Sequence, residues 1–403
     1  MKQVAALFFC ALLVRMAMIG VWYQSGKGGH LSSDGTGYHA LAESLSAGRG
    51  FQLEGRPTTR RPPLYPVLIA GLLPWSPFPL NVYVAQALLG AFSCIALFGV
   101  GRILFDPRTG LVASFLMAFD YVSVRQTVSV MAETLFVFFL ILGLYCLIRA
   151  EKERKNLWLI GAGILSGASL LTRDVQIFYY PCLILWFFLW GESWKKCFYR
   201  INAFVLPLLL VIGPWMVRNS LIHQRPVLIT TAAASTFYLA NNPTASGGTT
   251  GGDWGVASDS HPSQDVRWPT TEAVTPEWER YIINQSFDFI RNHPGRFVEL
   301  TVRKIVNMWR PYQADSPPLS RWATALTYLP VITLGLVGIF LRLRDWRKFF
   351  PILVLLLYTF SLHAVLIAHM RYRYPAMPFL MVFAASTLVS LWQKLRKQQY
   401  AVP

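Results

Sequence analysis

The chain has 403 residues, of which 54% are hydrophobic and only 14% charged, and its formal net charge is +17. Several apolar runs are long enough to cross a bilayer, which excludes an ordinary soluble domain and indicates a multi-pass membrane protein. The excess Lys and Arg lies in short connections at the ends of these runs, so membrane topology and anionic lipid explain the charge better than nucleic acid does. The five cysteines show no spacing typical of a disulfide framework or a metal site.

The first apolar run, residues 4–23, is long and is followed by no small-residue cleavage pattern, so we interpret it as a transmembrane helix rather than a signal peptide. In the loop after it, apolar residues recur at helical spacing from Tyr38 to Ala47 and stop before two glycines, which predicts a short amphipathic helix on the membrane surface. The next apolar stretch, residues 63–75, has about half the length that spanning requires and is rich in proline. We expect it to be interfacial or re-entrant.

Nine further runs are predicted to span the membrane, at approximately 79–101, 110–124, 133–149, 157–172, 175–190, 203–219, 322–341, 349–368 and 374–392. With the first run they predict an all-α fold with about ten transmembrane helices. Clusters of Lys and Arg follow alternate spans, and every cluster falls on the side of the N-terminus. The positive-inside rule therefore predicts that both termini are cytoplasmic and that the first loop, residues 24–75, is outside the cytoplasmic membrane.

The long segment 220–321 is predicted to be a second extracytoplasmic region. It opens with a sequence rich in Ser, Thr, Gly and Asn, and it closes with two predicted helices, 276–292 and 294–309, each of which begins at a proline. Its glycine-rich run, residues 247–252, lacks the Lys-Ser/Thr of a phosphate-binding loop, and we interpret it as a mobile flap. These features divide the chain into an N-terminal transmembrane catalytic module (1–219), the mostly helical outer segment (220–321), and C-terminal transmembrane helices with a cytoplasmic tail (322–403).

Asp34, in the first outer loop, is the first carboxylate of the chain and the main catalytic candidate. The structural alternative is that Asp34 caps a helix beginning at Gly35, and one residue can serve both purposes. Arginines are also common in the short outer connections, at Arg60, Arg61, Arg125, Arg173, Arg218, Arg371 and Arg373. Snorkelling or headgroup contact explains many such residues singly, but a set that converged with Asp34 would suit a phosphate-bearing substrate.

Three further carboxylates, Asp120, Glu133 and Asp174, lie near predicted outer helix ends. Capping or ion pairing is the expected role of each, and Glu133 is also a candidate second acidic group or metal ligand. His30 and His39 flank Asp34 and could hold a divalent metal ion with it, although solvated loop histidines are more common. No cofactor is otherwise indicated.

Seven short motifs occur in order along the whole chain: Asp34-Gly-Thr-Gly-Tyr38, Arg60-Arg-Pro-Pro-Leu-Tyr-Pro66, Ala132-Glu133-Thr-Leu-Phe136, Leu171-Thr-Arg173, Pro214-Trp-Met-Val-Arg-Asn219, Asn241-Asn-Pro243 and Arg371-Tyr-Arg-Tyr-Pro-Ala-Met-Pro378. In this order and on this topology, the chain resembles the polyprenyl-phosphate-sugar-dependent glycosyltransferases of the C superfamily. That group includes the protein O-mannosyltransferases and the lipid A aminoarabinose transferase.

The resemblance implies a polyprenyl-phosphate sugar as donor, an acceptor hydroxyl of a cell-envelope glycan, lipid or protein, and inversion at the anomeric carbon. Asp34 matches the acidic residue of the first outer loop, whose role would be general base. Tyr38 and Arg61 match positions that orient this loop and contact the donor phosphate. The other candidates for donor binding are Arg60, Tyr65, Arg218, Arg371 and Arg373. Where the lipid A transferase has an acidic residue before its basic one, this chain has Arg60, so a metal site of that kind does not carry over.

Three other functions are alternatives to this one. A polymerase or ligase that moves a whole lipid-linked oligosaccharide would use the same chemistry but would be expected to have a larger outer loop. A flippase or transporter of polyprenyl-phosphate lipids would place ionisable groups near the membrane midplane and often in two related halves, whereas the polar residues here gather at one face. A membrane scaffold would leave the Asp34 to Tyr65 loop unexplained.

Overall fold

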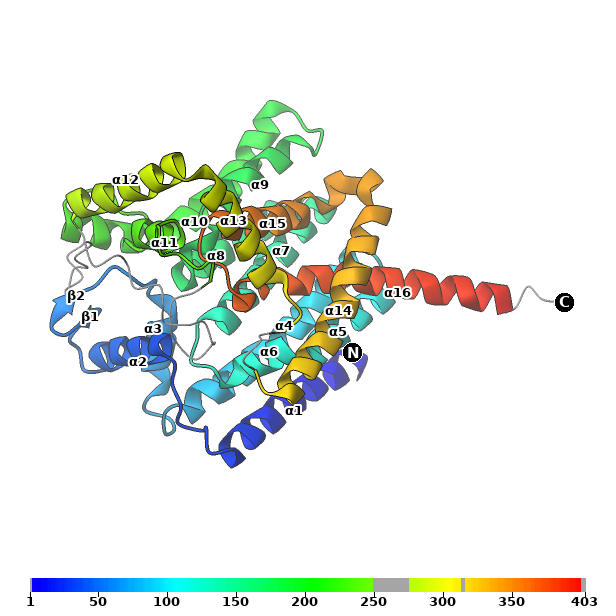
Figure 1. The fold of residues 1–403 in the computed structure, drawn as a ribbon. Coiled ribbons are helices and arrows are strands. Elements are labelled where there is room, and N and C mark those ends of the chain that lie inside the picture. The colour runs from blue at the N-terminus through cyan, green and yellow to red at the C-terminus, as the bar shows by residue number, and fades with distance from the viewer. Residues whose placement is uncertain (1, 249–274, 313–315, 400–403) are drawn as a thin grey trace.

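The computed structural model describes residues 2–248, 275–312 and 316–399, and nearly all of its regular structure is helical (Figure 1). The N-terminal helices are α1 (Lys2–Gln24), α2 (Ser33–Ser46), α3 (Leu64–Leu72), α4 (Leu80–Leu104), α5 (Pro107–Phe119), α6 (Tyr121–Arg125), α7 (Glu133–Glu153), α8 (Asn156–Thr172), α9 (Tyr179–Phe188) and α10 (Trp194–His223). They are followed by α11 (Ala233–Ala240), α12 (Pro276–Asn292), α13 (Pro294–Trp309), α14 (Pro318–Leu341), α15 (Trp346–Val365) and α16 (Met377–Gln399).

Short elements connect these helices. They are the 3-10 turns η1 (Gln126–Val128), η2 (Asp174–Gln176), η3 (Leu343–Asp345) and η4 (Met370–Arg373), and the antiparallel pair of strands β1 (Gln52–Leu53) and β2 (Arg56–Pro57). The small hairpin was not expected from the sequence. Its two-residue strands are too short to show an alternating pattern of apolar and polar residues.

Seven of the described helices are long and apolar enough to cross a membrane, namely α1, α4, α7, α10, α14, α15 and α16, the last two by the stretches 343–365 and 377–396. The other three predicted spans correspond to shorter helices: α5 with α6, α8 and α9. The structure therefore confirms an all-α multi-pass membrane fold. The count of ten spans and the orientation of the chain stay predictions.

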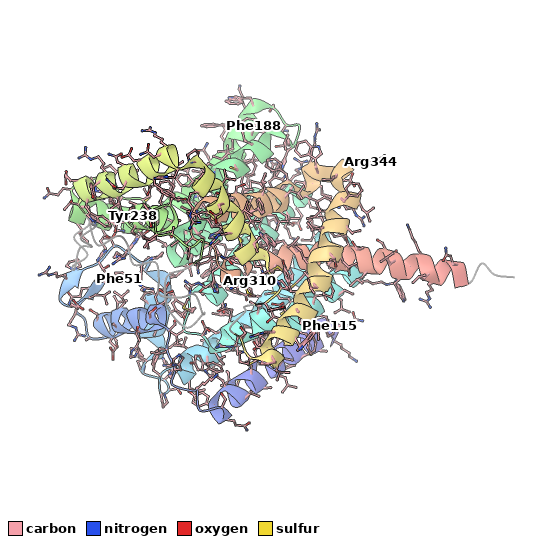
Figure 2. All side chains as sticks on the ribbon, in the orientation of Figure 1. Phe51, Phe115, Phe188, Tyr238, Arg310 and Arg344 are labelled. Carbon is pink, nitrogen blue, oxygen red and sulfur yellow. The ribbon has the colours of Figure 1, made fainter. Side chains whose placement is uncertain are left out.

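Close helix contacts build the bundle around α4, α7, α8, α10, α14 and α16, and side chains fill the space between the helices (Figure 2). Small residues make two of these contacts possible. A Cβ atom on Gly163 of α8 would lie 2.2 Å from the carbonyl oxygen of Phe204 on α10, and one on Gly338 of α14 would lie 2.5 Å from the carbonyl oxygen of Phe383 on α16. These pairs of backbones approach as membrane helices do when small residues lie at their interface.

The helices that were not expected to span gather at one end of the bundle. Figure 1 shows α2, α3, the hairpin and α11 at the left, whereas both termini lie toward the right. Residues 63–75 contain only the nine-residue helix α3, which agrees with the prediction that this stretch is too short to span. The predicted helices 276–292 and 294–309 are confirmed as α12 and α13 with the same bounds. Most of the glycine-rich run 247–252, which we interpreted as a flap, lies outside the described residues.

Candidate active site

Asp34 lies in the first turn of α2 and does not cap it. The capping residue is Ser32, whose hydroxyl oxygen accepts a hydrogen bond of 3.1 Å from the amide of Gly35. The alternative that Asp34 itself caps this helix is therefore wrong, because the helix begins one residue before it and its side chain has other partners. Those partners are two arginines: Arg61 donates through Nη2 to Oδ1 at 3.1 Å, and Arg371 donates through Nη2 to Oδ2 at 3.1 Å.

These two guanidinium groups set the charge of Asp34. Burial of the carboxyl group opposes its ionisation, but the charges of Arg371 and Arg61 and their hydrogen bonds outweigh burial, so the pKa of Asp34 lies below its ordinary value. The position in the first turn of a helix also favours the negative form. The side chain remains 34% exposed. Asp34 is thus an ionised carboxylate at neutral pH, and its exposed part is open to molecules that approach the protein surface.

Two tyrosine side chains, packed edge to face, hold Arg61 in place. The guanidinium lies over the ring of Tyr38, 4.5 Å from its centroid, and Tyr38 packs edge-on against Tyr65 at 4.9 Å. Tyr65 is fully buried and donates from its hydroxyl to Oε1 of Gln86 at 3.0 Å, which ties α3 to α4. Gly37 leaves room for the arginine, because a Cβ atom there would lie 3.1 Å from its Nη2. Tyr38 and Tyr65 therefore hold Arg61 in the position in which it pairs with Asp34.

Glu133 forms a second, deeper carboxylate at the start of α7. It is 1% exposed and pairs with Arg173, which confirms the expectation of ion pairing for this residue. Its Oε1 atom also lies 3.9 Å from Nε of Arg371. Arg371 therefore lies between Asp34 and Glu133. Among these five side chains, three positive charges face two negative ones, and the cluster carries one net positive charge.

Arg60 and Arg218 do not join this cluster. Arg60 is exposed, and its side chain has no hydrogen bond or ion pair with the described residues. Arg218 donates to the carbonyl oxygens of Phe51 at 2.9 Å and Thr58 at 3.1 Å, and it lies over the ring of Trp215. Its contacts fasten the hairpin of the first loop to α10. A role of either residue in donor binding stays a prediction.

Arg373 also lies apart from Asp34, although it is only two residues from Arg371. Its side chain is buried and donates to the carbonyl oxygens of Met308 and Arg310 at the end of α13. The guanidinium carbon lies 3.7 Å from the ring centroid of Tyr328. These contacts join η4, α13 and α14. A role of Arg373 in donor binding stays a prediction.

The two histidines beside Asp34 are placed differently from each other. His39 stacks on Phe78 with 3.8 Å between ring centroids, and its Nδ1 atom lies 3.8 Å from Glu43. His30 is exposed in the turn that precedes α2. In residues 2–248, 275–312 and 316–399, no group of three or more His, Cys, Asp and Glu side chains is arranged to hold a metal ion.

Tyr372 and the partner of Arg173 were not predicted from the sequence. Tyr372 accepts a hydrogen bond of 3.2 Å from Arg371, and its ring stacks on His363 at 4.8 Å. The only sequence signal was its place between two motif arginines. Of the other carboxylates at predicted outer helix ends, Asp120 caps α6 as expected, accepting from the amide of Ser123 at 2.8 Å.

The chain is similar to several known proteins. Residues 60–242 match the family described as dolichyl-phosphate-mannose-protein mannosyltransferase. Two relatives from Bacillus subtilis (strain 168) are named as putative mannosyltransferases: YycA is 30% identical over 148 residues, and YkcB is 27% identical over 200 residues. The matches cover 36% and 47% of this chain but only 20% and 27% of the relatives, so the chain spans about a quarter of their length.

Solved structures with the same fold come from the oligosaccharyltransferase of Archaeoglobus fulgidus. The apo form has a TM-score of 0.60 at 13% identity, and the complex with an inhibitory peptide and a dolichol-phosphate has a TM-score of 0.58 at 12% identity. Each covers 98% of this chain, which spans 51% of the archaeal protein. The chain is thus similar to mannosyltransferases over its matched segment, and it shares the fold of these solved structures.

Proposed function

We propose that the protein transfers a sugar from a polyprenyl-phosphate donor to a hydroxyl group of a cell-envelope glycan, lipid or protein, at the extracytoplasmic face of the cytoplasmic membrane. One observation carries the proposal. A partly exposed, ionised carboxylate, Asp34, lies between two arginines from distant parts of the chain, Arg61 and Arg371, with 3.1 Å to each. A base and two phosphate-binding groups are what such a reaction requires within one site.

In the proposed reaction, Asp34 accepts the proton of the acceptor hydroxyl while its oxygen attacks the anomeric carbon. The new bond to the acceptor oxygen forms as the bond to the phosphate oxygen breaks, and the electron pair leaves with the polyprenyl phosphate. Attack from the face opposite the leaving group inverts the anomeric configuration. The base must lie within hydrogen-bond reach of the acceptor oxygen, which the exposed edge of Asp34 permits.

Arg61 and Arg371 serve both the base and the leaving group. Each uses one nitrogen, Nη2, to hold Asp34, and a guanidinium group has further N–H donors for phosphate oxygens. The charge on the phosphate grows as the sugar leaves, so these donors stabilise the transition state more than the ground state. A phosphate that shares the two arginines also weakens their hold on Asp34. The pKa of Asp34 then rises toward its ordinary value, and the carboxylate becomes a stronger base.

The pair of Glu133 and Arg173 positions Arg371 for this role. The Nε atom of Arg371 lies 3.9 Å from Glu133. Burial opposes the charge of Arg371, but its interactions with the Tyr372 hydroxyl and with the carboxylates of Glu133 and Asp34 outweigh burial, so its pKa lies above its ordinary value. Arg371 therefore stays charged. In this proposal Glu133 is a positioning residue rather than a second base.

The test is release of free polyprenyl phosphate from a panel of polyprenyl-phosphate sugars, with purified wild type and Asp34→Asn in detergent and membrane extract as the source of acceptor. Release by wild type alone would support the transferase and identify its donor sugar. Release only from a donor that bears an oligosaccharide would favour the polymerase or ligase. The enzyme would give way to the flippase if neither protein released lipid phosphate while reconstituted vesicles showed lipid crossing the bilayer.

A further inference from the structure

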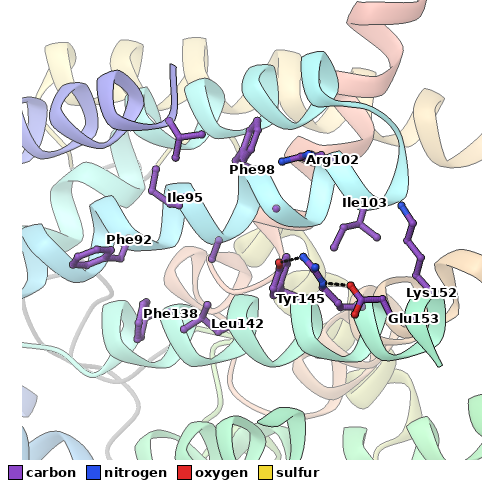
Figure 3. A pocket seen from close by; sticks show the side chains of 14 residues that line it. Phe92, Ile95, Phe98, Arg102, Ile103, Phe138, Leu142, Tyr145, Lys152 and Glu153 are labelled. Atoms are coloured by element: carbon purple, nitrogen blue, oxygen red, sulfur yellow. Dashed lines mark hydrogen bonds and ion pairs between the residues drawn. The ribbon is translucent and has the colours of Figure 1, made fainter. Parts of the chain in front are cut away.

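A groove with a volume of about 920 Å³ lies over α4, between α1 and α7 (Figure 3). Its walls change in character along its length. Apolar side chains line one part, namely Phe92 and Ile95 from α4 and Phe138 and Leu142 from α7. Charged side chains line the other part, namely Arg102 from α4 and Arg149, Lys152 and Glu153 from α7. Phe92 is 50% exposed, so the apolar part opens to the outside of the bundle, where the acyl chains of a bilayer lie.

This groove is remote from Asp34. Arg102 lies in the last turn of α4 and Lys152 in the last turn of α7, whereas Glu133 of the candidate active site is the first residue of α7. The 21-residue helix α7 therefore separates the two sites by about 30 Å, at 1.5 Å per residue. With the predicted orientation of the chain, the charged end of the groove lies at the cytoplasmic leaflet.

The positive charges of the groove are only partly neutralised by the protein. Arg149 donates to Oε1 of Glu153 at 2.6 Å and to the hydroxyl of Tyr145 at 2.7 Å, as the dashed lines in Figure 3 mark. Arg102 and Lys152 are exposed, and neither forms a hydrogen bond or ion pair with a described residue. Three positive charges against one carboxylate leave two positive charges at the end of an apolar groove.

We propose that this groove binds an anionic glycerophospholipid of the cytoplasmic leaflet. Its phosphate lies between Arg102 and Lys152, and one acyl chain follows α4 toward Phe92. The ten residues from Phe92 to Arg102 cover about 15 Å of helix, a length that suits one acyl chain within one leaflet. Basic pockets between transmembrane helices on the cytoplasmic side bind anionic head groups in this way. The proposal concerns a site separate from the reaction and does not depend on the identity of the donor.

The test is lipid binding to the full chain in a neutral detergent, measured by native mass spectrometry during titration with phosphatidylglycerol and, separately, phosphatidylcholine. The test variant is Arg102→Gln with Lys152→Gln. The control is Lys195→Gln with Lys196→Gln, which removes two exposed charges at the start of α10, outside the groove. We expect wild type and control to prefer phosphatidylglycerol, and the test variant to bind it about 25-fold more weakly, at roughly fivefold per charge. Equal binding by wild type and test variant, or no preference of wild type over phosphatidylcholine, would overturn the proposal.

A second variant tests the apolar part of the groove. Ile95→Trp places a larger side chain in the cavity on a partly exposed helix face, and we expect it to weaken phosphatidylglycerol binding while both cations remain. Binding at the wild-type level would show that the lipid lies elsewhere and would refute the site. Undecaprenyl phosphate provides a final comparison. If it bound at Arg102 and Lys152 more tightly than phosphatidylglycerol, the groove would belong to a polyprenyl lipid, and the assignment to a glycerophospholipid would be wrong.

Discussion

Replacement of Asp34 by asparagine is the most direct test of the candidate active site, because it keeps the shape of the side chain and removes its charge. Asparagine cannot accept the acceptor proton. General bases contribute roughly 10²- to 10⁴-fold to rates, which corresponds to about 3–5 kcal/mol of activation free energy. We therefore expect kcat/KM for the polyprenyl-phosphate donor to fall by at least about 100-fold.

The expected effect of the same change on folding is much smaller. Asp34 is 34% exposed, and each of its two pairs with arginine is worth about 0–1 kcal/mol at such a site. The amide oxygen of asparagine can still accept from one arginine, so the loss of stability should be about 1 kcal/mol. The apparent melting temperature in detergent should then fall by only a few degrees.

The assay is initial-rate release of polyprenyl phosphate, paired with thermal unfolding of the same preparations. Asp288→Asn is the matched control, since it removes an exposed carboxylate on α12 that lies outside the cluster. It should leave both readouts unchanged. The reasoning would be refuted if Asp34→Asn, folded as stably as expected, kept more than about a tenth of the wild-type kcat/KM, because a general base typically contributes at least about 100-fold.

Three further changes probe the surroundings of the site and the packing of the bundle. Arg61→Gln removes one of the charges that lower the pKa of Asp34, so the acid limb of the kcat/KM profile should move to higher pH. If the acid limb did not move, it would report the titration of a group other than Asp34. Glu133→Ala leaves Arg173, which is 20% exposed, without its buried counter-ion, and a cost of up to about 3–5 kcal/mol should appear as a large fall in melting temperature. Gly163→Ala should destabilise by about 1–3 kcal/mol, because the added methyl group meets backbone across the helix crossing, whereas Gly161→Ala, whose nearest contact is 3.8 Å away, should not.

The pH dependence of stability has a definite sign for Asp34. Its pKa is lower in the folded protein than in the unfolded chain, so its pairing stabilises the fold above the ordinary carboxyl pKa. This contribution is lost as the pH falls through the lowered value. Arg61→Gln should reduce it, which gives the acid limb of activity an independent check by acid unfolding.

The elements with strong local signals could be predicted from the sequence. Helices α12 and α13 have the predicted bounds because each begins at a proline that fixes its first turn. The helix in the first loop was predicted from the spacing of its apolar residues. The alternative that Asp34 caps this helix was wrong, since Ser32 and Asp34 are both good capping residues. Only the three-dimensional arrangement decides which of the two faces the amide of Gly35.

Which residues form the site was harder to predict, because arginines in similar motifs make different contacts. Arg371 reaches Asp34, while Arg373 turns to carbonyl groups at the end of α13. Nothing in the sequence distinguishes two arginines only two positions apart; both lie in the turn η4, and their side chains contact different parts of the structure. Likewise, the pair of Glu133 and Arg173 depends on the packing of α7 against α8, which residue spacing does not give.

The pair of Asp34 and Arg371 joins residues that are 337 positions apart in the chain. Asp34 and Arg61 are therefore synthesised together, whereas Arg371 follows only after α15 has been made. Until then, Asp34 can pair with Arg61 but lacks the residue that links it to Glu133. A chain that ends before η4 would contain the whole first loop and yet lack one of the two arginines that bind its carboxylate.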